Sequence, residues 1–222
     1  MRRIANHLKK PNWKGVNPMG KMNLLKANWE GKVGQTVGAK WKNKSTIRTY
    51  TKPSNPNTVA QQSVRGAFGQ MTKFVSLFAD QIKYLSALDT AGQSVRNAII
   101  KANKAQIDAG TFAKSTLVIS KGGLQKVANE AATATEGKIT VTWDKPTATN
   151  FTANAKLIAV CVQESTGLVE ILESEAKPSG PAQVASTMTF TAGKVDVYVY
   201  FLDKRGSNKV ASLSDYIEVT VG

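Results

Sequence analysis

Two hydrophobic periodicities divide the 222-residue chain. Between residues 64 and 82, apolar side chains recur at spacings of three and four, which predicts an amphipathic helix over residues 58–85. A weaker pattern of the same period predicts a second helix over residues 89–109, and Gly110 stands where that helix would end. Residues 58–115 are therefore expected to form a helical hairpin.

After residue 115 the apolar period changes to two, and Val, Ile, Thr and Tyr predominate. Turn-forming sequences such as ESTG and DKRGSN separate the alternating segments, as in antiparallel sheets whose neighbouring strands are joined by short turns. The pattern predicts strands at residues 117–120, 138–143, 155–164, 168–173, 187–191, 194–203 and 209–221. This regular spacing predicts an antiparallel β-sandwich over residues 116–222.

The beginning of the chain follows neither period. Residues 1–30 contain Pro and Gly without a sustained apolar face, which is typical of an extended arm. Residues 31–50 carry apolar residues punctuated by glycines, which predicts short strands or a hairpin. The expected fold class is α+β, with a basic extended arm and Gly-rich strands over residues 1–57, the helical hairpin over 58–115 and the sandwich over 116–222.

Positive charge is concentrated in the first part of the chain. Of the 30 Lys and Arg residues, 13 lie within residues 1–60, where Glu30 is the one acidic residue. Clustered cations repel one another unless a polyanion or an acidic protein surface neutralises them, and the tryptophans among them would serve as apolar anchors of a binding surface. A solvated basic face that only aids solubility is the alternative. The residues expected to contact an assembly partner or a polyanion are Arg2, Arg3, Lys9, Lys10, Trp13, Lys14, Lys21, Trp29, Lys32, Lys40, Trp41, Lys42, Lys44 and Arg48.

The inventory of reactive side chains argues against an enzyme. One Cys and one His exclude a disulfide framework and a Cys/His metal site. Cys161 lies in an apolar segment with no base beside it, so we expect no catalytic residue, metal, cofactor or small-molecule substrate. The chain lacks a run of about 18 apolar residues and a signal-peptide pattern, which predicts a soluble, non-secretory protein with no membrane partner. The side chains expected in the core are Phe68, Phe74, Phe78, Trp143, Cys161 and Tyr200.

Two segments of the C-terminal part resemble fibronectin type III and related immunoglobulin-like domains. The segment ITVTWDKP resembles the second strand of that family, with Trp143 as its buried tryptophan. The segment VDVYVYFLDKRGSNKVASLSDYIEVTV resembles the last two strands of that family, with Tyr198 or Tyr200 in the family's tyrosine region.

A longer resemblance covers residues 31–222. The segments GKVG, NPNTVAQ and LVISKG occur here in the order found in an uncharacterised protein family of Bacteroidetes and their crAss-like phages. The resemblance implies a non-enzymatic structural component of a tailed-phage virion, made in the host cytoplasm and assembled in many copies in the head, in the head-to-tail connector ring or collar, or as capsid decoration. The implied partners are portal, ring or capsid subunits and further copies of the chain itself, which makes a homo-oligomer the expected state.

Two other functions stay open on the sequence. As a nucleic-acid-binding protein, the chain would contact DNA phosphates through the same cations while Trp13, Trp29 or Trp41 stack on bases. As a surface adhesin, it would bind through the loops of the sandwich, an interpretation that rests on fold analogy alone. We favour the virion component, because non-specific duplex binding would make little use of tryptophans placed among cations.

Overall fold

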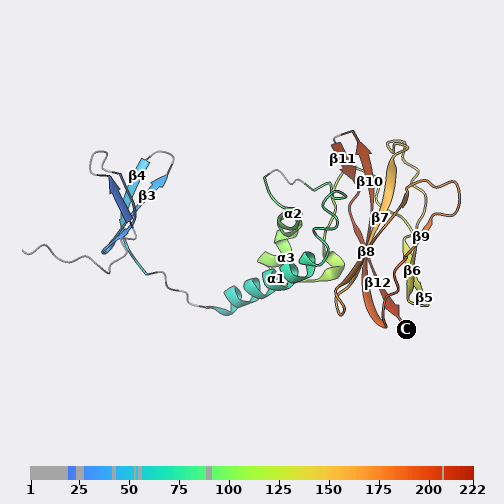
Figure 1. The fold of residues 1–222 in the computed structure, drawn as a ribbon, viewed down its shortest axis with the longest axis horizontal. Coiled ribbons are helices and arrows are strands. Elements are labelled where there is room, and N and C mark those ends of the chain that lie inside the picture. Colours follow the sequence, from blue (N-terminus) through green and yellow to red (C-terminus); the bar gives the residue numbers. More distant parts are fainter. Residues whose placement is uncertain are drawn as a thin grey trace, which may run out of the picture. The chain divides into compact units, whose positions relative to one another are not determined.

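In the computed structural model the described residues are 20–23, 28–41, 44–52, 54, 57–88, 92–206 and 208–222. These residues are mostly β, with three antiparallel sheets and few helices (Figure 1). The chain divides between residues 56 and 57 into two compact units. We call the described residues 20–54 the small unit and the described residues 57–222 the large unit. Residues 1–19 of the predicted arm lie outside the described residues.

The small unit is a four-stranded antiparallel sheet with the strand order β1-β2-β3-β4. Its strands are β1 (Gly20–Asn23), β2 (Asn28–Val33), β3 (Thr36–Trp41) and β4 (Lys44–Thr49). The prediction of an arm up to residue 30 is therefore wrong over β1 and the first part of β2. Glycines at three strand positions hid the alternating pattern, because a glycine adds no apolar side chain to either face.

Three helices of the large unit replace the two that the sequence predicted. The α1 helix (Val59–Ser76) begins at Thr58, whose hydroxyl accepts a hydrogen bond from the Gln61 amide at 3.3 Å, and it ends nine residues before the predicted end. The second predicted helix is split into α2 (Val95–Ala102) and α3 (Lys104–Asp108). The break falls at buried Asn103, whose backbone leaves the helical conformation with a ψ of 18° and whose side-chain amide binds the backbone of residues 99 and 118.

The larger sheet contains five strands around β10. They are β7 (Ala155–Gln163), β8 (Leu168–Glu175), β10 (Gly193–Arg205), β11 (Asn208–Ala211) and β12 (Asp215–Val221). The strand order is β11-β10-β7-β8, and β12 also pairs with β10. The single strand predicted over 209–221 is therefore two strands. They part where the Ser212 hydroxyl binds the Phe201 amide and the Ser214 hydroxyl binds the Ile119 amide.

A three-stranded sheet, with the order β5-β6-β9, completes the large unit. Its strands are β5 (Ala131–Thr135), β6 (Lys138–Thr142) and β9 (Gln183–Ala185). The sequence did not predict β5, because AATAT contains no large apolar residue. The strands predicted at 117–120 and 187–191 are absent from these described segments, since amides there donate to side chains of Asn103, Ser214 and Glu170 rather than to a neighbouring strand. A short 3₁₀ helix, η1 (Lys114–Thr116), precedes the first of them.

Two hydrophobic clusters cover the two faces of the five-stranded sheet. On β10, Tyr198 and Tyr200 belong to a cluster with the helices, whereas Val197 and Val199 belong to a cluster shared with the three-stranded sheet. Figure 1 shows the helices on one side of this sheet and β5, β6 and β9 on the other. Because the helical segment and the sheet share a core, the boundary predicted at residue 115 does not separate two domains.

The core residues expected from the sequence lie in these clusters, with one exception. Phe74, Phe78 and Tyr200 lie in the cluster with the helices, and Trp143 and Cys161 lie in the cluster between the sheets. Phe68 was expected in the core, but 48% of its surface is exposed. The geometry of α1 explains this exposure, because the buried side chains in this stretch of the helix are those of Ala67 and Met71. Phe68 therefore lies at the side of the buried stripe.

Candidate functional site

The register of the small unit places described cations on one face of its sheet. Lys32, Val37 and Arg48 lie directly opposite one another on three neighbouring strands. Lys32 and Arg48 are thus about 10 Å apart, which is two strand spacings. We call the face that carries this row the basic face.

An aromatic ring holds one of these cations in place. The Lys32 ammonium lies 3.6 Å from the centre of the Tyr50 ring, a cation–π contact, and 41% of Tyr50 is exposed. Arg48 is exposed to solvent. Among the cations of the basic face whose side chains the structure describes, one is therefore held by a ring and the other is exposed. Two such cations suit repeated anionic groups on a partner surface better than a single small anion.

The remaining residues expected to contact a partner are placed to different extents. Lys40 is exposed and belongs to the opposite face, two positions along β3 from Gly38. Four residues are placed by the backbone register alone: Lys21, Trp29, Trp41 and Lys44. Lys21 lies opposite Glu30, and Trp41 lies opposite Lys44. Trp29 pairs with Met22. The other expected contacts, Arg2, Arg3, Lys9, Lys10, Trp13, Lys14 and Lys42, lie outside the described residues.

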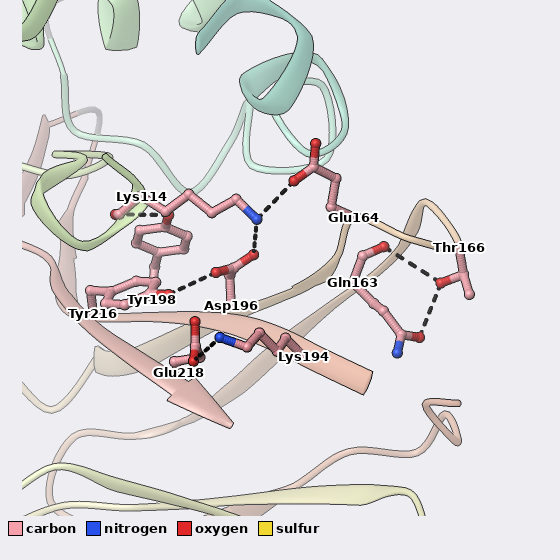
Figure 2. A network of polar contacts seen from close by, with 9 residues as sticks. All are labelled: Lys114, Gln163, Glu164, Thr166, Lys194, Asp196, Tyr198, Tyr216 and Glu218. Carbon is pink, nitrogen blue, oxygen red and sulfur yellow. Dashed lines mark hydrogen bonds and ion pairs between the residues drawn. The ribbon is translucent and has the colours of Figure 1, made fainter. Parts of the chain in front are cut away.

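The large unit contains a buried polar cluster that the sequence analysis missed (Figure 2). Asp196, 2% exposed, lies near the beginning of β10, where its carboxylate accepts a hydrogen bond from the Tyr216 hydroxyl at 2.8 Å. The Lys114 ammonium lies 2.9 Å from this carboxylate and 2.7 Å from that of Glu164. The Tyr198 hydroxyl donates to the Lys114 carbonyl oxygen at 3.0 Å. In the sequence, the signal for this cluster was Asp196, a charged residue within the otherwise apolar segment VDVYVY.

The electrostatics of this cluster are those of a structural clamp. Burial alone would lower the pKa of Lys114, but hydrogen bonds to Glu164 and Asp196 outweigh it, so the pKa is raised and the ammonium stays charged. The same ammonium lies 4.8 Å from the centre of the Phe74 ring on α1. Lys114 therefore joins η1, α1 and the sheet. Figure 2 also shows Gln163 with Thr166, and Lys194 with Glu218, which are contacts between neighbouring strands or turns.

The described residues show no cluster of metal-ligating side chains and no helix that could span a membrane. Among them, no three His, Cys, Asp or Glu side chains are grouped to hold a metal ion. No helix in the same part of the chain is long and apolar enough to cross a membrane. Burial raises the pKa of the Cys161 thiol to about 12, so this cysteine is held as the unreactive thiol.

The described fold is thus that of a β-rich protein with a separate basic sheet and a larger unit with helices on one sheet. The chain belongs to the family of unknown function DUF6266, whose model matches residues 27–217 and so includes parts of both units. No curated protein matches the chain. Among solved structures it is similar to the rat CD45 extracellular region, domains d3–d4, at 15% identity and a TM-score of 0.34. That match covers 46% of this chain and 52% of the CD45 fragment, so the chain spans about half the length of that fragment.

Proposed function

We propose that this chain is a non-enzymatic structural component of a tailed-phage virion, which attaches through the basic face of its small unit to an acidic surface of a portal, ring or capsid subunit. The large unit would then be the rigid body that the attachment presents. The virion setting rests on the resemblance of the GKVG, NPNTVAQ and LVISKG segments to the family of Bacteroidetes and crAss-like phages.

The observation that carries the attachment is the separation of charge between the units. Residues 20–50 contain seven Lys or Arg against one Glu, a net charge of +6, and they form a sheet of their own. A concentrated field of one sign speeds the encounter with an oppositely charged partner. The large unit has its own core and its own internal ion pairs, as between Lys114 and Asp196, so its fold does not depend on the small unit's cations.

We further propose that the two sheets of the large unit form an immunoglobulin-like sandwich. Trp143 supports this arrangement, because it is 5% exposed, belongs to the cluster between the sheets and donates its indole N–H to the Ala176 carbonyl oxygen at 3.3 Å. Such sandwiches serve many unrelated functions, so this part of the proposal defines the body and not its partner.

Two variants of matched charge test the attachment. Lys32→Gln with Arg48→Gln removes the two cations of the basic face whose side chains the structure describes. Lys101→Gln with Lys121→Gln removes two exposed cations from the large unit. We expect the first pair to slow incorporation into particles about 3- to 10-fold at low salt, because charge at a binding surface acts mainly on the association rate. The control pair should incorporate like the wild type. Equal slowing by both pairs would contradict attachment through the basic face.

The virion setting has a test of its own. Tailed particles purified from cells that encode the chain are probed with an antibody against the large unit, and we expect many copies per particle. Its absence from the particles overturns the virion setting. The nucleic-acid alternative is tested by titrating duplex DNA at two salt concentrations. At about 0.9 per phosphate contact, the log-log salt slope of DNA binding should fall by about 1.8 in the Lys32→Gln, Arg48→Gln variant if both cations contact phosphates. Such a fall, together with micromolar DNA binding and no co-assembly, would replace the proposal by the nucleic-acid alternative.

A further inference from the structure

The strand β4 forms one edge of the sheet in the small unit (Figure 1). Among the described residues it pairs with β3 and with no other strand. An edge strand presents backbone amides and carbonyl groups that a further strand can bind. Every residue from 46 to 50 is exposed to solvent, and 61% of the surface of Ile47 is exposed. Within the described part of the chain, this edge is therefore accessible.

The pairing with β3 decides which backbone groups of β4 point to the open edge. The Tyr50 amide donates to the Gln35 carbonyl oxygen at 2.6 Å, which extends the ladder of β3 and β4 by one pair. In an antiparallel ladder, hydrogen-bonded pairs alternate with pairs that are not hydrogen-bonded. Every second position counted back from Tyr50 therefore binds β3. The positions between them, Ser45, Ile47 and Thr49, direct their amides and carbonyl groups to the open edge.

The described part of the small unit has little apolar core of its own. None of its described residues belongs to the two hydrophobic clusters, which lie in the large unit. Val33 and Tyr50 are each 41% exposed. A sheet usually gains its stability from a covered apolar face, so backbone pairing contributes a larger share of the stability here. A strand added to β4 would extend the ladder on which this unit depends.

The chemistry of this edge indicates what kind of strand can be added. The strand KSTIRT contains two cations and no acidic residue, and Arg48 is exposed. Two such strands from separate copies would repel each other, because charges on an edge strand oppose pairing between edges. A nucleic acid fits poorly, because phosphates accept hydrogen bonds and cannot donate to the outward carbonyl groups of Ile47 and Thr49. An extended peptide supplies both donors and acceptors, and acidic side chains on it would neutralise the cations.

We propose that the small unit binds an acidic, extended segment of its partner protein as a fifth strand on β4. Backbone hydrogen bonds to the outward positions would hold the segment, as in other complexes formed by strand addition. Successive side chains of a strand point to opposite faces. The segment therefore alternates, with acidic residues beside Arg48 on the basic face and apolar residues beside Ile47 on the other face. The inference rests on the proposed attachment to an acidic partner, and it names how that partner is bound.

Three capped peptides of alternating Glu and Val residues test the added strand in calorimetric titrations of the full chain. The first peptide is unmodified, the second is N-methylated at its Val residues and the third at its Glu residues. With Val opposite Ile47, the Val amides are those that point to β4. We expect the second peptide to bind at least about tenfold more weakly than the first, because its methyl groups leave carbonyl groups of β4 without donors. The third peptide should bind as the first does. Equal binding of the two methylated peptides, or no binding of the unmodified peptide at about 1 mM, overturns the proposal.

The Ile47→Pro variant tests the same edge from the side of the chain. Proline is tolerated where the N–H of an edge strand faces solvent, so this variant should keep its far-UV circular dichroism while it loses the outward amide. Ile47→Thr is the matched control, since it also removes the apolar side chain but keeps the amide. We expect the unmodified peptide to bind Ile47→Pro at least about tenfold more weakly than Ile47→Thr. Equal binding by the two variants would refute the added strand.

Amide hydrogen exchange of the wild type needs no variant. The Ile47 and Thr49 amides should exchange rapidly in the free chain and slowly with the unmodified peptide, whereas the Tyr50 amide is bonded to Gln35 in both states. Protection of the Ile47 amide without peptide, by a second copy or by residues 1–19, overturns the proposal. If the peptides fail to bind while Lys32→Gln with Arg48→Gln still slows incorporation into particles, the attachment through the basic face stands and the added strand is refuted.

Discussion

Two phenylalanines of the same helix offer the sharpest test of how the large unit is held together. Phe74 is 1% exposed, and its ring lies 5.7 Å from that of Phe78, 6.0 Å from that of Phe112 and 6.3 Å from that of Tyr198. Phe68 lies six residues earlier on α1 and is 48% exposed. Replacing each by alanine makes the same chemical change in the same helix, so the difference between the two variants isolates burial.

The expected costs follow from what each ring loses. Phe74→Ala gives up the transfer energy of a buried ring and leaves a cavity among three aromatic neighbours, so it should lower the free energy of unfolding by about 3–5 kcal/mol. Phe68→Ala gives up about half of a buried ring's 1.5–3 kcal/mol and leaves no enclosed cavity. Alanine also regains up to about 0.7 kcal/mol of helix propensity in both variants. The two changes in unfolding free energy should therefore differ by about 2–4 kcal/mol.

Urea unfolding followed by far-UV circular dichroism measures this difference, with the transition of the large unit analysed as two-state. If Phe74→Ala does not accumulate in folded form, Phe74→Leu provides a smaller step at the same position, with an expected cost of about 1–2 kcal/mol. Equal costs for the two alanine variants would show that α1 is not packed on the sheet through Phe74. That result would refute the assignment of this helix to the core.

Three further predictions concern the large unit. Trp143→Ala should lower the free energy of unfolding by about 3–5 kcal/mol, and a loss below 1 kcal/mol in urea titration would remove it from the core. Burial raises the pKa of the Cys161 thiol to about 12, so this thiol should not react with Ellman's reagent at pH 8 in the folded chain and should react fully in guanidinium. Rapid reaction of the folded chain would contradict its burial. Burial alone would raise the pKa of Asp203, but hydrogen bonds from Thr152 and Arg205 outweigh it and lower the pKa. A carboxyl whose pKa is depressed by folding stabilises the fold at a pH above its unfolded pKa of about 3.9, and this stabilisation is lost as the pH falls through its folded pKa. Asp203→Asn should therefore lower the free energy of unfolding more at pH 7 than at pH 2. A loss of unfolding free energy that is the same at both pH values would contradict the argument.

The sequence predicted those elements whose side chains alone set their pattern. The strands β7, β8 and β10 have strong apolar alternation or runs, and they lie close to where the pattern placed them. The sequence failed where contacts distant in the chain decide the structure. Asn103 splits a helix because it reaches the backbone of residue 118, and Glu170 accepts the amides of Thr187 and Met188, which would otherwise have been available to a strand.

The candidate site shows the same division. The excess of cations before residue 60 is a property of composition and needed no fold. Which cations share a face depends on strand register, which glycines at positions 20, 31 and 38 concealed. Lys114 illustrates a further limit, because its partners Glu164 and Asp196 lie about fifty and eighty residues along the chain. No local pattern links such residues, although an aspartate within an apolar strand could have drawn attention to the cluster.

The alternation of β10 between two cores protects the chain against a folding error. Tyr198 and Tyr200 point to the helical side, where their hydroxyls donate to the carbonyl oxygens of Lys114 and Leu85 at 3.0 and 3.1 Å. A slip of one residue in the pairing of β10 with β7 would exchange these tyrosines with Val197 and Val199. Both hydroxyls would then enter the apolar space between the sheets, where an unpaired hydroxyl costs about 1–3 kcal/mol. The tyrosines thus act as a register check, which makes the shifted strand pairing less stable than the native one once the helical segment packs on the sheet.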